Sequence, residues 1–422
     1  MRQLISQVLK TATFRQTVIT TISTFASAGL GAVFYLLMAR LMPPSDYGLF
    51  TLATTSALMA ISIADLGSGQ SLIRFAGQNL AGHGYFPFAL ISLRLKVIAG
   101  VVSLAAFYVF ARPLANSLLH QPALVSLMPY AGLATLSMLL ISFPADLARG
   151  LQKFLLWGGI QIGSNILRLA LLGGLFLGAL ITPQSSLLIF ALAPLAVFFV
   201  SWTWLDKGIL HSHISSDQVR HFWSFNRWTA AFIISSAITS RLDTFVSARY
   251  LGLEQLGIYG LATTMATFMP QLSGAFGAVT SAKFASFTDA DHSARYLKKG
   301  LLFTTTISLV VAAAMIPTAM FVIWFTGGAY AASLTPFLIL LSALVLFTSL
   351  TPLRDSIFYY HARPDLFLWT SLAQSAVILL VGSQLIPRFG VVGSSLTVLL
   401  SLVFLSIVNI FYYLRLTAAK GS

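Results

Sequence analysis

The sequence is built of long, uncharged, apolar stretches, and this pattern leaves the chain few possible folds. A helix needs about 20 apolar residues to cross a bilayer, and the run from Gln16 to Ala39 alone has 24. Still longer stretches without a charged residue are residues 113–145, 169–205 and 300–353. Only 9% of the residues are charged and 57% are hydrophobic, whereas a soluble domain has about 25% charged residues. The pattern excludes a water-soluble globule and indicates an integral membrane protein with many spans.

The apolar stretches predict about twelve membrane-spanning helices. They are far too long for the strands of a barrel and lack the alternation of such strands. Because the first stretch is of spanning length, we expect a helix there and not a cleaved signal peptide. The predicted spans are residues 16–39, 47–73, 89–111, 123–145, 155–180, 186–205, 228–248, 256–282, 300–325, 333–353, 366–386 and 391–414.

The basic residues set the orientation of these spans. With the N-terminus in the cytoplasm, 19 of the 25 Lys and Arg residues, Lys96 included, fall on the cytoplasmic side and four on the opposite side. This asymmetry is what the positive-inside rule expects. The net charge of +14 is therefore mostly a matter of topology and does not indicate a nucleic-acid partner. We predict that both termini are cytoplasmic, and only Arg168 and Arg241 remain inside spans.

A repeat at an offset of 209 residues relates the two halves of the chain. Residues 39–55 align without gaps to residues 248–264, with 7 of 17 positions identical, and the same offset places residues 74–76 on 283–285. Chance similarity between apolar helices explains matched Leu and Ala, but not the matched Arg, Gly and basic-Phe-Ala positions. Because six predicted spans separate the copies, both copies have the same orientation, which makes this a parallel repeat.

The predicted architecture is an all-α integral membrane fold with two six-helix lobes. Residues 1–206 form the N-lobe with helices 1–6, residues 207–227 form a cytoplasmic linker, and residues 228–422 form the C-lobe with helices 7–12. Two lobes around a central cleft are typical of a transporter.

Polar residues inside the spans recur at helical spacing. Gln161, Asn165 and Arg168 follow the spacing i, i+4, i+7 in the fifth span. Asp243 shares a face with three serines in the seventh span, and Gln271 belongs to a polar stripe in the eighth. Such faces line either a water-filled path or a helix–helix interface.

A charge near the middle of a span must be paired or must face water. We expect Arg168 and Asp243 to face a water-filled path, whereas Arg241 either does so or pairs with an acid from another helix. Asp65 precedes Leu66-Gly67-Ser68-Gly69, where the glycines favour a break in the helix. It is therefore either a lumen or hinge residue or a buried, hydrogen-bonded side chain.

Further basic residues lie near the cytoplasmic ends of spans. Side chains there usually extend to lipid headgroups, and the alternative is contact with an anionic substrate. These residues are Arg74, Arg94, Lys283 and Arg354.

The sequence has no motif for catalysis. It has no cysteine, a single glutamate, and neither a phosphate-binding glycine loop nor a zinc-binding HExxH pattern. We therefore expect no enzymatic activity, no metal and no cofactor. Transport would draw on an ion gradient, the membrane potential or the gradient of the substrate. Asp65 or Asp243 would then bind a coupling proton or Na⁺, the alternative being that each balances an arginine.

The segment Ala39–Phe50, followed by Asp65-Leu66-Gly67 and Arg74-Phe75, resembles the polysaccharide transporter family, which contains the Wzx-like O-antigen-unit flippases. The segments 241–243 and 250–259 resemble the matching motif of the second half. One departure is at Met42-Pro43, where Leu-Gly is usual in the family. These motifs cover about a quarter of the chain and say little about the substrate.

The resemblance implies a MATE-like fold of the multidrug/oligosaccharidyl-lipid/polysaccharide exporter (MOP) superfamily, in a bacterial inner membrane. It implies a flippase that moves an undecaprenyl-pyrophosphate-linked oligosaccharide to the periplasmic leaflet by alternating access, for O-antigen and lipopolysaccharide synthesis. Membrane lipids and the polysaccharide polymerase machinery are its implied partners. Arg168 and Arg241 would then be the cations within the membrane, and Arg74, Arg94, Lys283 and Arg354 would form the cytoplasmic entry.

Three alternatives stay open at this point. They are a cation-coupled multidrug exporter, a lipid II-type flippase and a scaffold without transport activity. An exporter of organic cations needs acidic cavities. Within the bounds of the predicted spans, however, cations outnumber acids once Arg94 and Lys96 of the span 89–111 are counted with Arg168 and Arg241.

Overall fold

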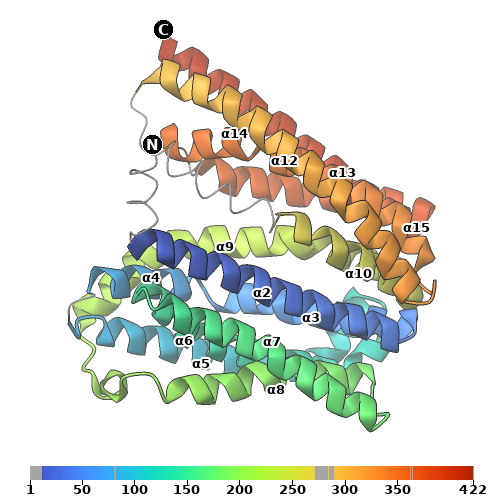
Figure 1. The fold of residues 1–422 in the computed structure, drawn as a ribbon, viewed down its shortest axis with the longest axis horizontal. Helices are drawn as coiled ribbons and strands as arrows, with labels where there is room; N and C mark the ends of the chain where they lie inside the picture. Colours follow the sequence, from blue (N-terminus) through green and yellow to red (C-terminus); the bar gives the residue numbers. More distant parts are fainter. Residues whose placement is uncertain are drawn as a thin grey trace. The chain divides into compact units, whose positions relative to one another are not determined.

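The computed structural model describes residues 12–79, 82–270, 284, 289–361, 363 and 365–421. All regular structure in these ranges is helical, as predicted, and the chain divides into two compact units (Figure 1). Unit 1 consists of residues 1–41, 53–118 and 122–237, and unit 2 of residues 42–52, 119–121 and 238–422. The helices α3 and α9 each belong to both units because the division falls within them.

Unit 1 is a bundle of long helices connected by short turns. Its helices are α2 (Ala12–Leu41), most of α3 (Pro44–Ala64), α4 (Ser68–Gln78), α5 (Phe86–Val109), α6 (Met128–Gly150), α7 (Phe154–Leu177), α8 (Pro183–Trp202) and the first part of α9 (Ser216–Tyr250). Three short helical segments join them: η1 (Pro113–Leu118), η2 (Pro122–Ser126) and η3 (Lys207–His211).

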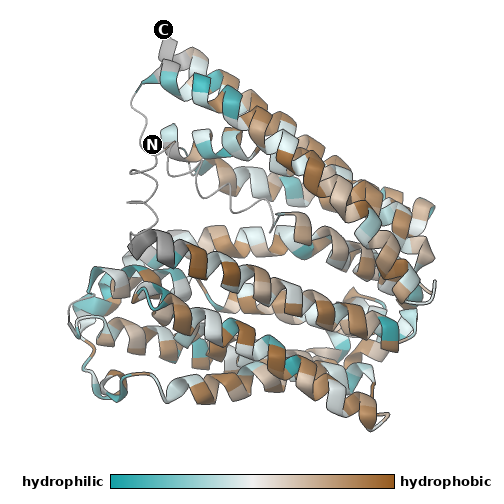
Figure 2. Cartoon of the chain, viewed as in Figure 1, coloured by the Kyte–Doolittle hydropathy of each residue, from teal (hydrophilic) through white to brown (hydrophobic). Residues whose placement is uncertain are grey.

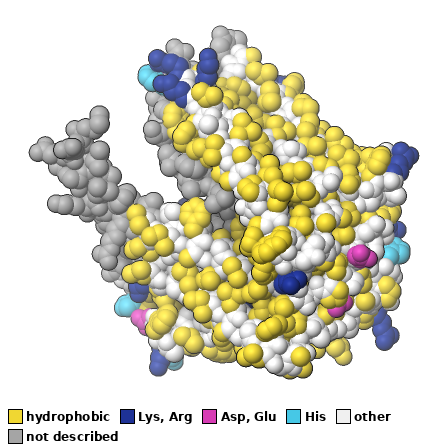
Figure 3. All heavy atoms as spheres, turned by 45° about the vertical axis from the view of Figure 1, so that its right-hand side comes forward, with side chains coloured by type: hydrophobic (Ala, Val, Ile, Leu, Met, Phe, Trp, Pro, Cys, Tyr) yellow, Lys and Arg dark blue, Asp and Glu magenta, His cyan; other side chains and the backbone are white. Residues whose placement is uncertain are grey.

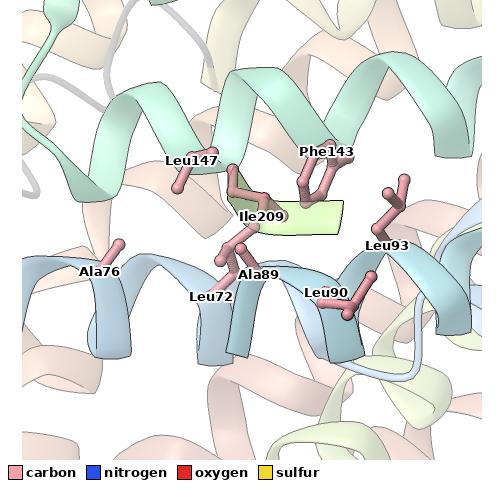
Figure 4. Close-up of a cluster of buried hydrophobic side chains, with 8 residues drawn as sticks. All are labelled: Leu72, Ala76, Ala89, Leu90, Leu93, Phe143, Leu147 and Ile209. Atoms are coloured by element: carbon pink, nitrogen blue, oxygen red, sulfur yellow. The ribbon is translucent and has the colours of Figure 1, made fainter. Parts of the chain in front are cut away.

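A buried cluster holds together one end of unit 1. Leu72 and Ala76 of α4 meet Ala89, Leu90 and Leu93 of α5 and Phe143 and Leu147 of α6, as Figure 4 shows. Ile209 of η3 completes the cluster from the segment predicted to be a linker. This segment is therefore packed against the bundle, and α9 already begins inside it, at Ser216.

Unit 2 contains the last part of α9, from Ile238, and the helices that follow. These are α10 (Leu253–Ala266), α12 (Ala290–Phe325), η4 (Ala331–Ser333), α13 (Leu334–Ser349), α14 (Thr351–Asp355), η5 (Ser356–Tyr360) and α15 (Asp365–Gly421). The 57-residue α15 is two helices joined at Gly390, whose φ of 58° and ψ of −131° are not helical. This kink lies in the predicted gap between the last two spans.

Nine helices in the described residues are long and apolar enough to cross a membrane. One of them, Asp365–Ala418, contains two predicted spans. These nine helices contain ten of the twelve predicted spans. The predicted span 228–248 falls on α9, which is not among the nine, and the predicted span 256–282 begins in α10 and continues outside the described residues.

The surface is that of a protein in lipid. Hydrophobic side chains predominate on the face in Figure 3, and long hydrophobic segments run along the helices in Figure 2. Leu177, Tyr108 and Trp324 are 87%, 73% and 73% exposed. Large apolar patches of this kind are rare on soluble monomers, so these helices face hydrocarbon.

The repeat is visible in the helix boundaries. Helix α2 ends at Leu41 and α9 at Tyr250, while α3 begins at Pro44 and α10 at Leu253. Each pair of positions is separated by 209 residues. Because these helix ends fall at equivalent positions of the repeat, the two halves have the same local structure at this turn.

The second predicted span, 47–73, is wrong as one continuous helix. Helix α3 ends at Ala64, and a new helix, α4, begins at Ser68. Between them, Leu66 and Gly67 have φ values of 49° and 75°. A glycine tolerates such a conformation readily, so the break suspected from the glycines is present, and it turns the chain into a separate short helix.

Candidate functional site

Arg168 places a positive charge in the interior of unit 1. It lies near the middle of α7 and is 8% exposed. Its guanidinium carbon is 4.2 Å from the centre of the Phe190 ring, and its Nη2 is 3.3 Å from the sulfur of Met138. No acid pairs with it among the described residues. Its charge therefore has polarizable and polar neighbours but no counter-ion among the described residues.

Asn165 lies beside Arg168, as the helical spacing predicts. Its Oδ1 accepts a hydrogen bond of 3.4 Å from Arg168 Nη1, and its Nδ2 donates to the hydroxyl of Ser27 on α2 at 2.9 Å. Gln161, one turn earlier, contributes its backbone carbonyl to the same Asn165 amide at 3.1 Å. The predicted polar face of α7 is thus a connected group that contacts α2.

The guanidinium of Arg168 has N–H donors that are not used in hydrogen bonds with the described residues. Arginine carries five N–H donors in a fixed plane, and the buried Nε has no hydrogen-bond partner among the described residues. A buried cation without a counter-ion costs several kcal/mol. An anionic group that reached this position would balance the charge and accept the remaining N–H donors.

A second charged group joins three helices of unit 1. Lys96 of α5 is fully buried, and its Nζ is 2.5 Å from Asp65 Oδ1, 3.2 Å from Asp146 Oδ2 and 2.7 Å from Ser142 Oγ. All three ammonium donors are therefore used. The charge count places Lys96 on the cytoplasmic side, which the structure does not test. What the count does not reveal is that Lys96 is buried, with its charge balanced by Asp65, in the turn after α3, and by Asp146 of α6.

The turn that follows Asp65 is fixed by α9. The Nδ2 of Asn226 donates to the carbonyl of Leu66 at 2.6 Å, and the Asn226 Oδ1 accepts from Ser71 Oγ at 2.9 Å. Asp65 itself also accepts from the backbone N–H of Gly69 at 3.3 Å. Asp65 is thus held in a hydrogen-bonded network at the α3–α4 break.

Asp243 lies in unit 2, on α9, in a different environment. Its carboxylate accepts a hydrogen bond from the hydroxyl of Tyr259, which is 1% exposed. Asp243 forms no ion pair with a described residue. Arg241 lies two residues away and is half-buried, and it too forms no ion pair within the described residues. A half-buried carboxylate that forms no ion pair with a described residue is a candidate site for a cation or a proton.

The basic residues near the helix ends differ in their surroundings. Arg74 and Arg94 are exposed. Arg354 donates to the carbonyl of Phe347 at 2.6 Å and to Thr351 Oγ1 at 3.0 Å, so it satisfies groups at the end of α13. Burial lowers the pKa of Arg354 to about 10, which leaves it charged at neutral pH. Gln271 and Lys283 lie outside the described residues.

A cavity opens at another part of unit 1, between the ends of α5, α6, α7 and α8. It has a volume of about 300 Å³, and Tyr85, Lys153, Trp204 and Asp206 contribute to its lining. Burial and the Asp206 carboxylate raise the pKa of Tyr85. None of the predicted site residues lines this cavity.

Comparison with known proteins identifies the family. The profile of the family described as "Polysaccharide biosynthesis protein" matches residues 13–284. The chain belongs to this family. No curated protein matches the sequence.

Solved structures show which fold this family member has. An inward-facing multidrug resistance MATE family transporter of the MOP superfamily has a TM-score of 0.74, with 14% identity over 96% of this chain and 99% of that one. The lipid II flippase MurJ in an inward closed conformation gives 0.76, with 14% identity over 95% and 90%. A MOP superfamily transporter from Pyrococcus furiosus gives 0.66, with 13% identity over 98% of each chain. The fold is that of the MOP transporters.

Some charged residues of this family member escaped the sequence analysis. Lys96 lies within the predicted span 89–111, and Asp146 lies just after the predicted span 123–145. A lysine so deep in a span requires an acid, and this signal would have identified Lys96 as buried. The choice of Asp65 and Asp146 as its partners depends on how α3, α5 and α6 pack, which spacing along the chain does not reveal.

Proposed function

We propose that the protein is a flippase for a polyprenyl-pyrophosphate-linked oligosaccharide. It moves this lipid from the cytoplasmic to the periplasmic leaflet of a bacterial inner membrane by alternating access, for the synthesis of O-antigen or another surface polysaccharide. Both termini are cytoplasmic in this proposal. Membership of the polysaccharide biosynthesis family and the MOP transporter fold support the transporter class.

The observation that carries the substrate class is the buried, acid-free guanidinium of Arg168. A pyrophosphate group is a compact, strongly charged anion that must cross a medium of low dielectric constant. Arginine stays charged there and binds phosphate oxygens through two parallel hydrogen bonds. Asn165 and Gln161 lie on the same helical face. Gln161 would offer its side-chain amide to the attached sugars, whereas the Asn165 amide, which bonds to Arg168 and to Ser27, would hold the guanidinium in position.

The remaining basic residues belong to the path on either side of this position. Arg241 is the second cation within a span, and Gln271 lies in the polar stripe of the following span. In the proposed topology a cytoplasmic entry collects the anionic headgroup by long-range attraction. Its residues are Arg74, Arg94, Lys283 and Arg354.

For a coupling cation, proton or Na⁺, the contacts favour Asp243 over Asp65. The charge of Asp65 is already balanced by Lys96 at 2.5 Å. Asp243 accepts a hydrogen bond from the neutral hydroxyl of Tyr259 and forms no ion pair with a described residue. A bound cation or proton would therefore change the local charge more at Asp243.

The test is substitution of Arg168 in a strain that lacks its own flippase and displays a surface glycan only when complemented. A charge-assisted hydrogen bond contributes about 1.5–3 kcal/mol, so Arg168→Ala is expected to slow translocation roughly 10- to 100-fold. Arg168→Lys keeps the charge without the planar fork and is expected to give an intermediate rate. At matched expression, lipid-linked units should accumulate facing the cytoplasm.

The matched control is Arg112→Ala, which removes an exposed arginine from the same unit and from the predicted periplasmic side. It is expected to leave glycan display unchanged. Normal display with Arg168→Ala would refute the proposed role of this residue.

The same experiment separates the alternatives that share this fold. A lipid II-type flippase would restore peptidoglycan precursor transport in place of surface glycan. A cation-coupled multidrug exporter would protect the cells against organic cations, and its activity would not depend on a buried arginine.

A further inference from the structure

The cavity between the ends of α5, α6, α7 and α8 is a preformed pocket that the proposed function does not use. Its volume of about 300 Å³ is at the lower end of the range of small-ligand sites. Its apolar lining belongs to the core of unit 1, because Leu147 is a member of the buried cluster in Figure 4 and Tyr85, Leu151 and Leu205 pack against that cluster. The pocket therefore needs no ligand to create its shape.

One part of the pocket is suited to an anion. Lys153 lines it and directly precedes the first residue of α7. The Lys153 ammonium forms no hydrogen bond or ion pair with a described residue. No side chain caps the start of α7, whose first N–H groups have no partner within the helix and carry the positive end of its dipole. An ammonium beside such a helix start favours a phosphate group.

The same pocket is lined by a negative group. Asp206 follows the end of α8, and its Oδ1 accepts a hydrogen bond of 2.9 Å from the backbone N–H of Gly208. Its other carboxylate oxygen has no hydrogen-bond partner among the described residues. Although Asp206 and Lys153 line one pocket, they form no ion pair with each other. The pocket therefore presents a cation and an anion at separate points.

Tyr85 adds a hydrogen-bond donor between these charges in the chain's local chemistry. Its ring packs on the buried cluster, and its hydroxyl forms no hydrogen bond with a described residue. Burial and the Asp206 carboxylate raise the pKa of Tyr85, so the hydroxyl stays protonated at neutral pH. It can therefore donate to an oxygen of a bound anion.

The pocket lies where the hydrocarbon-facing surface of unit 1 ends. Trp204 lines it and is 58% exposed, and Leu155, next to the lining residue Leu156, is 67% exposed. Tryptophan and tyrosine are typical of the boundary between membrane and water, because each has an apolar body and a polar tip. A ligand in the pocket can therefore keep its acyl chains in the bilayer. In the predicted topology this end of the helices is cytoplasmic.

We propose that this pocket binds the zwitterionic headgroup of a phospholipid with a phosphate and a primary ammonium, phosphatidylethanolamine, from the cytoplasmic leaflet. The phosphate meets Lys153, the start of α7 and the Tyr85 hydroxyl, and the ammonium donates to Asp206. A primary ammonium has three N–H donors, whereas a choline headgroup has none and a glycerol headgroup carries no cation. The site lies apart from the proposed transport function and does not rest on it, and only the choice of leaflet follows from the predicted topology.

The test is lipid binding by the purified full-length protein, delipidated in detergent and then titrated with one lipid at a time. The probes are phosphatidylethanolamine, phosphatidylcholine and phosphatidylglycerol with identical acyl chains, and native mass spectrometry measures the bound fraction. Because the ammonium makes a charge-assisted hydrogen bond, we expect phosphatidylethanolamine to bind about fivefold more tightly than either other lipid, or better. Equal affinity for phosphatidylethanolamine and one of the others, or a preference for phosphatidylglycerol, would overturn the proposal.

Two variants separate the roles of the two charges. Asp206→Asn keeps the oxygen that accepts from Gly208 but loses the charge, and it is expected to erase the preference for phosphatidylethanolamine. Lys153→Met is expected to weaken all three lipids about threefold, since all carry the phosphate and an accessible ion pair contributes modestly. The matched control is Asp217→Asn, which removes an exposed acid of the same unit that does not line the pocket. An unchanged preference in Asp206→Asn, or an equal loss in the control, would overturn the proposal.

Two further comparisons complete the test. Without lipid, Asp206→Asn and Lys153→Met are expected to unfold at the temperature of the wild type, and if Asp206→Asn fails to fold, unchanged binding of all three lipids by Lys153→Met would still overturn the proposal. Free phosphoethanolamine carries the same charges without acyl chains and is expected not to displace the lipid at equal concentration. Displacement would indicate a site for a soluble compound and overturn the assignment to a lipid. Because no arm measures glycan display, a failure here is distinct from a failure of the proposed function.

Discussion

Lys96 is predicted to stabilise unit 1 by balancing two acids, and the variant Lys96→Met tests this. Methionine keeps most of the aliphatic stem but removes the ammonium group, which lies 2.5 Å from Asp65 and 3.2 Å from Asp146. The carboxylates are only 20% and 18% exposed, so water compensates them poorly. Breaking a buried ion pair by removing one partner typically costs about 3–5 kcal/mol, and Lys96→Met is expected to lose stability in this range.

The assay is thermal unfolding of the purified protein in detergent, followed by the fraction that stays monodisperse. Lys153→Met is the control, because Lys153 is exposed and forms no ion pair within the described residues. The variant Lys96→Met/Asp65→Asn/Asp146→Asn removes all three charges together. It is expected to recover more than half of the lost stability, since no uncompensated charge remains.

Two results would refute this reasoning. If Lys96→Met unfolds at the temperature of the wild type, the triad contributes nothing to folding. If the neutral triple variant is as unstable as Lys96→Met, the loss arises from packing and not from unbalanced charge.

Three further substitutions have defined outcomes. Gly257→Ala should destabilise the protein by roughly 1–3 kcal/mol through overpacking, because its Cβ would lie 1.9 Å from the carbonyl oxygen of Pro44. Gly159→Ala, where a Cβ would meet nothing within 4 Å, should be neutral or stabilising in the same unfolding assay. Asn226→Ala should cost about 1–3 kcal/mol because it leaves buried polar groups unpaired, and proteolysis should reveal it as faster cleavage near residues 65–67. Tyr259→Phe should preserve folding but alter the cation dependence of transport, and unchanged dependence would argue against a coupling role for its partner carboxylate.

The sequence predicts this fold well wherever a rule acts along the chain. Span length and the repeat together placed the helix ends near Leu41 and Tyr250, and they separated the last two spans around the kink at Gly390. The glycines after Asp65 marked a real break. The exact consequence, a new helix from Ser68, depends on Asn226 from a distant helix and was missed.

The candidate site is predictable only in part. Helical spacing correctly placed Asn165 next to Arg168. The partners of Lys96 and of Asp243 lie 31, 50 and 16 residues away, and nothing in the local pattern selects them. The hydrogen bonds that Gln121 donates to the α9 end and that Tyr330 donates to the carbonyl of Met42 were missed for the same reason, although the 209-residue offset relates the two donors.

In the proposed function, Arg168 binds the pyrophosphate headgroup of a lipid-linked oligosaccharide while this group crosses the membrane. The most direct measurement is the rate at which the purified protein in proteoliposomes moves such a lipid between leaflets, compared for wild type and Arg168→Ala with equal amounts of folded protein. The account predicts a rate at least tenfold lower for Arg168→Ala. Equal rates for the two proteins, or wild-type transport of an organic cation in place of the lipid, would contradict it.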